Sequence, residues 1–229
     1  MTGFDKKSEA PVSGGKEEPL PCKQRIGIMG GTFDPIHIGH LILGECAYEE
    51  FGLDKVLFMP SGNPPHKKDA SGRASNEHRQ KMTSLAIASN PHFELSLIEM
   101  EREGYIYTNE TLRILKKEHP DTEYYFIMGA DSLFQFHEWR SPQIIADLAV
   151  LAVAVRDNVS DEALDHRIAQ MEEMYHARIL KMSVPNIDVS STGIREAIAG
   201  GKSCRYFLPD RVMDYIQDNG LYMPAERTD

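Results

Sequence analysis

The chain has 229 residues, 41% of them hydrophobic, with a formal net charge of −10 and an isoelectric point near 5.4. This length allows one substantial core, and the acidity argues against binding nucleic acid or a membrane surface, both of which require a basic face. No stretch approaches the roughly 18 apolar residues of a membrane span, and the N-terminus lacks a signal-peptide core. Cys22, Cys46 and Cys204 have no metal-ligand spacing and suit a reducing compartment, so we expect a cytoplasmic protein.

Residues 1–22 differ in composition from the rest of the chain. They carry charged pairs, glycines and prolines with hardly any apolar periodicity, which predicts a disordered N-terminal extension. A regulatory or partner-binding tail is the alternative. Residues 23–229 are expected to form a single domain.

The first candidate site follows an apolar run made by Ile26, Ile28 and Met29, which predicts a strand buried on both faces. Gly30 and Gly31 are expected to turn the backbone sharply and to let an anionic ligand approach it. His37 and His40 would share one face of the helical turn that follows. Because a helix N-terminus carries free N–H groups and a positive dipole end, the two imidazoles would add donors to an anion site.

A second polar loop follows the next predicted strand. Gly52 is expected to end the first helix, and residues 56–60 form a short apolar strand. Residues 61–68, SGNPPHKK, then make a rigid loop at the carboxyl end of that strand, the edge at which open α/β sheets bind ligands. On local grounds alone, a solvated loop tip explains it equally well.

Two helices are predicted in the middle of the chain. The first covers residues 76–89, with His78 and Arg79 on its solvated outer face. The second begins within residues 105–112, where Thr108 is the expected N-cap.

A further turn follows the strand predicted at residues 124–128. Gly129 again permits close approach to the backbone. Asp131 is explained locally by a plain helix cap. Trp139, the only tryptophan, offers a flat face for an aromatic ligand, although it would be unremarkable as core filler.

Strands and helices continue to alternate toward the C-terminus. Residues 149–155 and 178–182 predict strands on either side of a charged helix at 161–175. Such alternation requires parallel pairing with right-handed crossovers, so we expect an α/β fold with a doubly wound, mostly parallel sheet and helices on both faces.

The last motif is VSSTGIREAI at residues 189–198. Ser190, Ser191 and Thr192 supply hydroxyls that cap a helix, and Arg195 is expected on its first turn. A guanidinium beside free N–H groups binds phosphate oxygens well, although ordinary caps explain the hydroxyls alone.

Residues 31–40, GTFDPIHIGH, resemble the signature of the HIGH-motif nucleotidyltransferases, which transfer a nucleoside monophosphate from a triphosphate. Four further motifs extend the resemblance over residues 24–229 and are similar to those of bacterial nicotinate-nucleotide adenylyltransferases: PPHK (64–67), YTNETL (107–112), GADSL (129–133, followed by Trp139) and SSTGIR (190–195).

The resemblance implies a Rossmann-like domain that joins ATP and nicotinate mononucleotide, giving nicotinate adenine dinucleotide, a precursor of NAD, and pyrophosphate. It implies as catalytic residues His37, His40, Lys67 and Arg195. It implies an ATP site made by Gly30, Gly31, Thr32, Phe33, His37, His40, Gly129, Asp131, Ser190, Ser191, Thr192 and Arg195. It implies a nicotinate-nucleotide site made by Lys67, Tyr107, Thr108 and Trp139. Mg²⁺ would be a cofactor that arrives with ATP, near Asp131, without a site made by protein side chains alone.

Two other functions stay open. A related enzyme acting on nicotinamide mononucleotide, phosphopantetheine or glycerol phosphate would share the first motif, and a nucleotide-sensing protein would bind without turnover. Lys181-Met182-Ser183 imitates a signature of aminoacyl-tRNA synthetases, but Lys181 falls inside a predicted strand and the chain is too acidic for tRNA. We expect no nucleic-acid or membrane partner and leave the oligomeric state open, a homo-oligomer included.

Overall fold

A single six-stranded sheet organises the protein. The computed structural model describes residues 23–62, 73–155 and 161–223. Every strand pairs parallel to its neighbours, in the order β3-β2-β1-β4-β5-β6. The strands are β1 (Arg25–Gly31), β2 (Lys55–Pro60), β3 (Phe93–Leu95), β4 (Glu123–Gly129), β5 (Ala149–Val155) and β6 (Ile179–Ser183).

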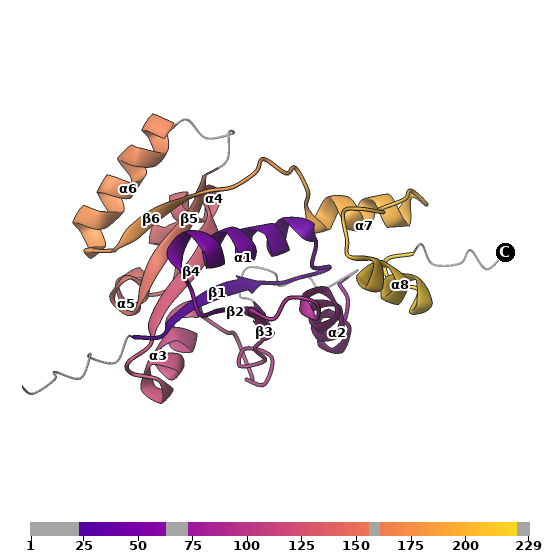
Figure 1. Ribbon diagram of the computed structural model, residues 1–229, viewed down its shortest axis with the longest axis horizontal. Helices are drawn as coiled ribbons and strands as arrows, with labels where there is room; N and C mark the ends of the chain where they lie inside the picture. Colours follow the sequence, from indigo (N-terminus) through magenta and orange to yellow (C-terminus); the bar gives the residue numbers. More distant parts are fainter. Residues whose placement is uncertain (1–22, 63–72, 156–160, 224–229) are drawn as a thin grey trace, which may run out of the picture.

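Helices cover both faces of the sheet (Figure 1). One face is covered by α1 (Ile38–Phe51) and α2 (Asn76–Ile87), and α7 (Ser191–Ala199) and α8 (Asp210–Asp218) extend the same core beyond the end of the sheet. The other is covered by α3 (Thr108–Glu118), α4 (Ala130–Phe134), the short 3₁₀ helix η1 (Phe136–Glu138), α5 (Pro142–Leu148) and α6 (Asp161–Tyr175). The expected doubly wound fold is therefore confirmed.

The apolar runs predicted the central strands correctly because these strands are buried on both faces. Side chains that alternate along β4 pack on opposite faces: Phe126 joins the core beneath α3 to α6, whereas Tyr125 and Ile127 join the core beneath α1 and α2. Because a strand covered on both faces has no solvated side, the sequence of β5 reads as a continuous apolar run, and Ala149 to Ala154 are all buried.

The order of the strands places a crevice at one edge of the sheet. From β1 the chain moves outward through β2 and β3, and then returns to pair β4 with the other side of β1. Helices on opposite faces leave a gap outside the carboxyl ends of β1 and β4, the point where open α/β sheets bind ligands. The loops after Gly31 and Gly129 therefore face the same region.

Most predicted element ends are close to the observed ones. Gly52 caps α1 with a left-handed φ of 55°, as expected from glycine. Thr108 is the first residue of α3 rather than its cap, because the extended residue before the helix is Tyr107. Lys181 lies within β6, as expected, where it pairs with Asp165 at 2.7 Å.

Candidate functional site

The loop between β1 and α1 turns at Phe33, not at the glycines. Gly30 and Gly31 continue the strand, and the left-handed residue is Phe33, with φ of 49°. The prediction of a glycine turn was therefore wrong. A Cβ on Gly31 would lie 2.7 Å from the Phe33 ring, so this glycine makes room for the aromatic side chain. Both glycines lie at the wall of a cavity.

The two histidines meet at the N-terminus of α1, as the sequence predicted. His37 is the N-cap residue, and its backbone N–H donates to Nδ1 of His40 over 3.2 Å. Their rings stack with centroids 3.7 Å apart, and Phe33 packs edge-on against His40. Because Nδ1 of His40 accepts a hydrogen bond, the neutral ring carries its proton on Nε2 and is a donor there.

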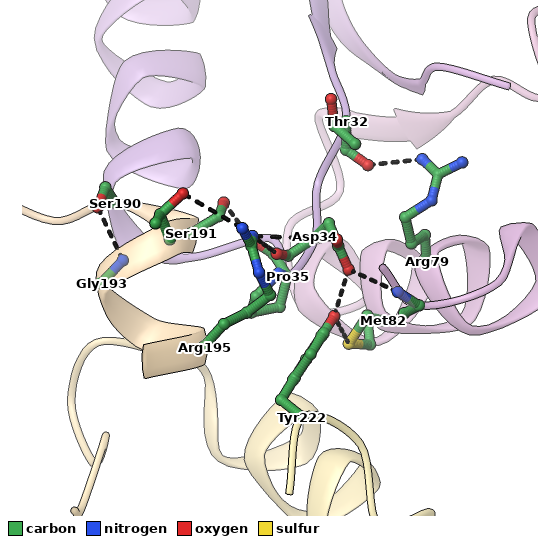
Figure 2. A network of polar contacts seen from close by, with 12 residues as sticks. Thr32, Asp34, Pro35, Arg79, Met82, Ser190, Ser191, Gly193, Arg195 and Tyr222 are labelled. Atoms are coloured by element: carbon green, nitrogen blue, oxygen red, sulfur yellow. Dashed lines mark hydrogen bonds and ion pairs between the residues drawn. The ribbon is translucent and has the colours of Figure 1, made fainter. Parts of the chain in front are cut away.

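The N-terminus of α7 docks on this same loop (Figure 2). The Ser191 hydroxyl donates to the carbonyl of Pro35 over 2.9 Å, and Nη1 of Arg195 donates to the carbonyl of Asp34 over 2.6 Å. Ser190 caps the helix by accepting from the amide of Gly193. The structure thus brings the SSTGIR motif against the loop that leads to the histidine pair, with Arg195 in the second turn of α7 instead of the first.

The Arg195 guanidinium has a second contact, on its own helix. Its Nη2 donates to the Thr192 hydroxyl over 3.3 Å. The side chain is thereby held along the β1–α1 loop. Arginine in this position combines fixed charge with hydrogen-bond donors near a helix N-terminus, which is the chemistry of an anion site.

A cavity of about 840 Å³ opens on the other side of β1. Its wall includes Gly30, Gly31 and Thr32 from the β1 end and Tyr107, Thr108 and Trp139 from the region after β3 and β4. Six of the residues that the sequence assigned to ligands therefore share one cavity.

The aromatic wall of this cavity is held by packing. Trp139 is half-buried, with its ring centroid 5.8 Å from that of Phe126 and 5.7 Å from that of Phe136. The Arg140 guanidinium lies over the Tyr107 ring at 4.3 Å, a cation–π contact. One end of the cavity is thus aromatic and fixed, as a stacking site for a flat ring requires.

Glu99 also lines the cavity, and sequence reasoning missed it. Its Oε1 accepts from the Thr111 hydroxyl over 2.9 Å. Burial raises the pKa of the Glu99 carboxyl, and the Thr111 hydrogen bond and the Arg102 charge oppose this rise. The surrounding sequence LIEMEREG gave no signal, because its four acidic and basic residues look alike in a solvated stretch.

Arg79 overturns another expectation, that it lies on a solvated helix face. It is 0% exposed, and its Nη1 donates to the Thr32 carbonyl over 2.6 Å (Figure 2). Nη2 donates to Asn76 Oδ1 over 2.6 Å and to the Gly62 carbonyl over 3.3 Å. Burial lowers the pKa of the Arg79 guanidinium, and the nearby Asp34 carboxylate opposes this. Arg79 therefore ties the loop after β1 to the loop after β2.

His78, the other residue expected on that face, is half-buried, with Nδ1 2.9 Å from the Tyr215 hydroxyl of α8. This contact belongs to the packing of α2 against α8. The expectation of a solvated His78 was therefore only partly right.

The remaining candidate residues are placed less tightly. Gly129 and Asp131 lie at the carboxyl end of β4, and the Asp131 side chain is exposed. Lys67 lies outside the described residues. Within residues 23–62, 73–155 and 161–223, no three His, Cys, Asp or Glu side chains gather in a way that could hold a metal ion. In the same part of the chain, none of the helices has the length and apolarity to cross a membrane.

A parallel sheet in this strand order, with an anion site and a cavity at its crevice, defines the nucleotide-binding class of α/β proteins. The cytidylyltransferase-like family matches residues 28–197. A protein of Lachnoclostridium phytofermentans named probable nicotinate-nucleotide adenylyltransferase is 45% identical over 200 residues, covering 87% of this chain and 100% of the relative. A Thermoanaerobacter protein of the same name is 44% identical over 203 residues, covering 88% of this chain and 96% of the relative.

The fold has a solved counterpart. Nicotinic acid mononucleotide adenylyltransferase of Plasmodium falciparum, in its complex with NaAD, superposes with a TM-score of 0.70 at 18% identity, covering 87% of this chain and 97% of that one. This chain belongs to the cytidylyltransferase-like family and, within it, to the nicotinate-nucleotide adenylyltransferases, so it is a nucleotidyltransferase. The family expected from the sequence motifs is confirmed.

Proposed function

We propose that the protein transfers the adenylyl group of ATP to nicotinate mononucleotide. One observation carries the proposal: the 840 Å³ cavity lies at the start of the β1–α1 loop, where Thr32 lines it, and the stacked His37–His40 pair lies where that loop enters α1. A volume of this size suits a mononucleotide, since ligand pockets typically measure about 300–1,000 Å³. The loop would therefore bring the phosphates of two substrates together.

The chemistry requires no protein nucleophile. An oxygen of the 5′-phosphate of nicotinate mononucleotide attacks the α-phosphorus of ATP and forms a P–O bond, while the bond between the α-phosphorus and the bridging oxygen to the β-phosphate breaks. Pyrophosphate leaves with that electron pair. Catalysis then consists of positioning and of stabilising charge on the phosphates.

The donors for this charge come from the β1–α1 loop and from α7. His37, His40 and the N-terminus of α1 would face the α- and β-phosphates. Ser191 and Arg195 would bind the triphosphate, a role that their docking on the same loop supports.

Further ATP contacts are proposed around these donors. Gly30, Gly31, Thr32 and Phe33 would supply backbone near the nucleotide, and Ser190 and Thr192 the caps of α7. Gly129 would leave space, since a Cβ built there meets no atom of the described residues within 4 Å. Lys67 is proposed for the phosphates on the family resemblance alone.

A divalent cation fits the exposed carboxylate of Asp131. Mg²⁺ keeps several waters and is commonly held by one or two carboxylates together with substrate phosphates, so a single exposed aspartate at the carboxyl end of β4 suits it. When bound, Mg²⁺ would neutralise part of the triphosphate charge.

The pyridine ring would lie in the cavity against Trp139. The amides of Thr108 and Asn109 precede the first intrahelical bond of α3, which runs from Glu110 N to Tyr107 O. Such N–H groups at a helix N-terminus bind carboxylates well, so they would receive the nicotinate carboxylate.

The cellular setting is proposed from composition. The net charge of −10 supports small-molecule substrates over nucleic acid or membrane partners. The free thiols of Cys46 and Cys204 support a cytoplasmic location.

Pyrophosphate release tests the function. The protein with ATP, Mg²⁺ and nicotinate mononucleotide should release pyrophosphate and form nicotinate adenine dinucleotide in equal amounts. Parallel reactions with phosphopantetheine, or with CTP and glycerol phosphate, should be at least a hundredfold slower. Binding of ATP without any turnover would overturn the proposal in favour of nucleotide sensing.

A further inference from the structure

Asp34 joins three segments that are far apart in the sequence. Its side chain is 6% exposed, and its Oδ1 accepts from the Tyr222 hydroxyl over 2.6 Å and from the Ala74 amide over 3.2 Å. Arg195 donates to the backbone carbonyl of Asp34 over 2.6 Å, while the carboxylate oxygen Oδ2 lies 3.9 Å from the same nitrogen. Figure 2 shows Tyr222 and Arg195 reaching Asp34 from different elements.

The backbone on both sides of this contact is unusual. Phe33, which precedes Asp34, has φ of 49°, and Tyr222 has φ of 63°. Residues with a Cβ rarely adopt this left-handed region, and they keep it only where surrounding contacts determine it. At Tyr222, which lies beyond the end of α8, the hydroxyl bond to a buried carboxylate is such a contact.

Tyr222 and Arg195 can both bind the Asp34 carboxylate. The short hydrogen bond from Tyr222 fixes Oδ1, and Oδ2 then stays at the outer limit of an ion pair with Arg195. The guanidinium bonds instead to a neutral carbonyl and to the Thr192 hydroxyl. A guanidinium that bonds to neutral oxygens keeps its charge for another anion, whereas a close carboxylate would neutralise it.

We propose that Tyr222 is a positioning residue for the phosphate end of the site: its hydroxyl holds the Asp34 carboxylate back from Arg195, so that the guanidinium stays available to the triphosphate. This inference rests on the proposed function, in which Arg195 binds ATP. It assigns to the segment after α8 a part in nucleotide binding, although the described residues of this segment, 219–223, contribute nothing to the cavity wall.

The test removes one oxygen atom. In Tyr222→Phe the Asp34 carboxylate keeps only the longer bond from the Ala74 amide and turns toward Arg195, so the Kd of a non-hydrolysable ATP analogue, measured by calorimetry, should rise about tenfold. The KM for nicotinate mononucleotide should change by less than about twofold. Tyr215→Phe is the matched control, because it removes a hydroxyl that contacts His78 and not Asp34.

A double-mutant cycle shows whether the effect passes through Asp34. In Asp34→Asn the neutral amide still accepts from Tyr222 but does not neutralise Arg195, so ATP should bind at least as tightly as in the unmodified protein. Adding Tyr222→Phe to Asp34→Asn should then leave the Kd unchanged. An unchanged Kd for the ATP analogue in the Tyr222→Phe single variant would overturn the inference. So would an equal loss of affinity when Tyr222→Phe is made in the unmodified protein and in Asp34→Asn.

Two controls distinguish a role of Tyr222 in ATP binding from a purely structural role and from a failure of the proposed function. A purely structural role for Tyr222 would lower the melting temperature without changing ATP affinity relative to nicotinate-nucleotide affinity, and that result counts against the proposal. If Tyr222→Phe does not fold, the Asp34→Asn variant tests the proposal by itself. Weaker ATP binding in Asp34→Asn than in the unmodified protein would contradict the proposal. An unmodified protein that binds ATP but forms no dinucleotide would refute the proposed function, while the comparison of Kd values would still test Tyr222.

Discussion

The rings of His37 and His40 stack with their centroids 3.7 Å apart, and the amide of His37 donates to the imidazole of His40. Each ring therefore depends on the other for its orientation at the N-terminus of α1. If the two rings bind developing charge on the phosphates, their hydrogen bonds strengthen in the transition state and not in the bound substrate. Substituting either histidine therefore tests whether the pair stabilises the transition state.

We expect His40→Ala and His37→Ala to lower kcat by about a hundredfold or more, with a smaller rise in the KM for ATP. Steady-state kinetics with circular dichroism as a check on folding would measure this. His119→Ala is the control, because His119 is exposed at the end of α3, far along the chain from the loop. Unchanged kcat in both variants with an intact fold would refute the assignment of the pair.

Arg79 should matter for stability as well as for the site. Arg79→Met leaves two carbonyls and the Asn76 side chain without their donor, and hydrogen bonds to a charged group contribute about 1.5–3 kcal/mol. We expect a loss of about 3 kcal/mol in the free energy of unfolding, measured with urea. Arg79→Lys should lose less, because it keeps one donor to the Thr32 carbonyl.

The control for Arg79 is Arg113→Met, since Arg113 is an exposed arginine on α3. Its substitution should change the free energy of unfolding by less than about 0.5 kcal/mol. Equal stability of the Arg79→Met and Arg113→Met variants would show that the buried guanidinium does not hold the two loops together.

Apolar periodicity predicted the sheet well because the strands are buried on both faces. The continuous apolar run of β5 is typical of a strand buried on both faces, and Gly52 ends α1 through its own backbone freedom. The juxtaposition of the β1–α1 loop and α7 also followed from the sequence, but only through the family's motifs. Periodicity alone did not indicate that Ser191 would bond to Pro35.

The predictions failed where contacts between segments that are distant in the sequence determine the structure. Arg79 was expected in solvent, because an arginine early in a helix usually is; its partner carbonyls at Thr32 and Gly62 are supplied by two other loops. Phe33 takes the left-handed turn that the glycines were expected to make, since its ring packs against His40. Glu99 was missed for a similar reason, as only the folded chain brings it to Thr111. The roles of the individual site residues stay predictions.

Glu99 predicts a pH-dependent difference in stability. Burial raises its pKa in the folded protein above the ordinary value of 4.5, so folding favours the neutral form. The favourable contribution is complete below pH 4.5 and is lost as the pH rises through the folded pKa, where the ionised carboxylate is penalised. Glu99→Gln keeps the acceptor for Thr111 and removes that penalty.

We therefore expect Glu99→Gln to melt at a higher temperature than the unmodified protein at pH 8. At pH 4 the two proteins should melt at the same temperature. Scanning calorimetry at the two values measures this. Glu101→Gln is the control, because Glu101 is exposed. A Glu99→Gln variant that is less stable at pH 8 than at pH 4, relative to the unmodified protein, would contradict the burial of an ionisable group here.

The preference between nicotinate and nicotinamide is the sharpest test of the cavity. Nicotinate carries one more negative charge, and the amides at the start of α3 are donors that suit it. The sequence offered no acceptor for an amide N–H, but the structure places Glu99 in the cavity wall. Its Oε1 already accepts from the Thr111 hydroxyl, so this acceptor is engaged within the protein.

We accordingly expect kcat/KM for nicotinate mononucleotide to exceed that for nicotinamide mononucleotide by tenfold to a hundredfold, because a lost charge-assisted bond and a buried unpaired amide each cost about 1–3 kcal/mol. Trp139→Ala should reduce this ratio, since the ring that holds the pyridine against α3 is gone. Tyr105→Ala is the control: Tyr105 is a 48% exposed aromatic outside the cavity wall, and its loss should leave the ratio unchanged. Comparable kcat/KM for the two mononucleotides in the unmodified protein would overturn the nicotinate preference and leave adenylyl transfer standing.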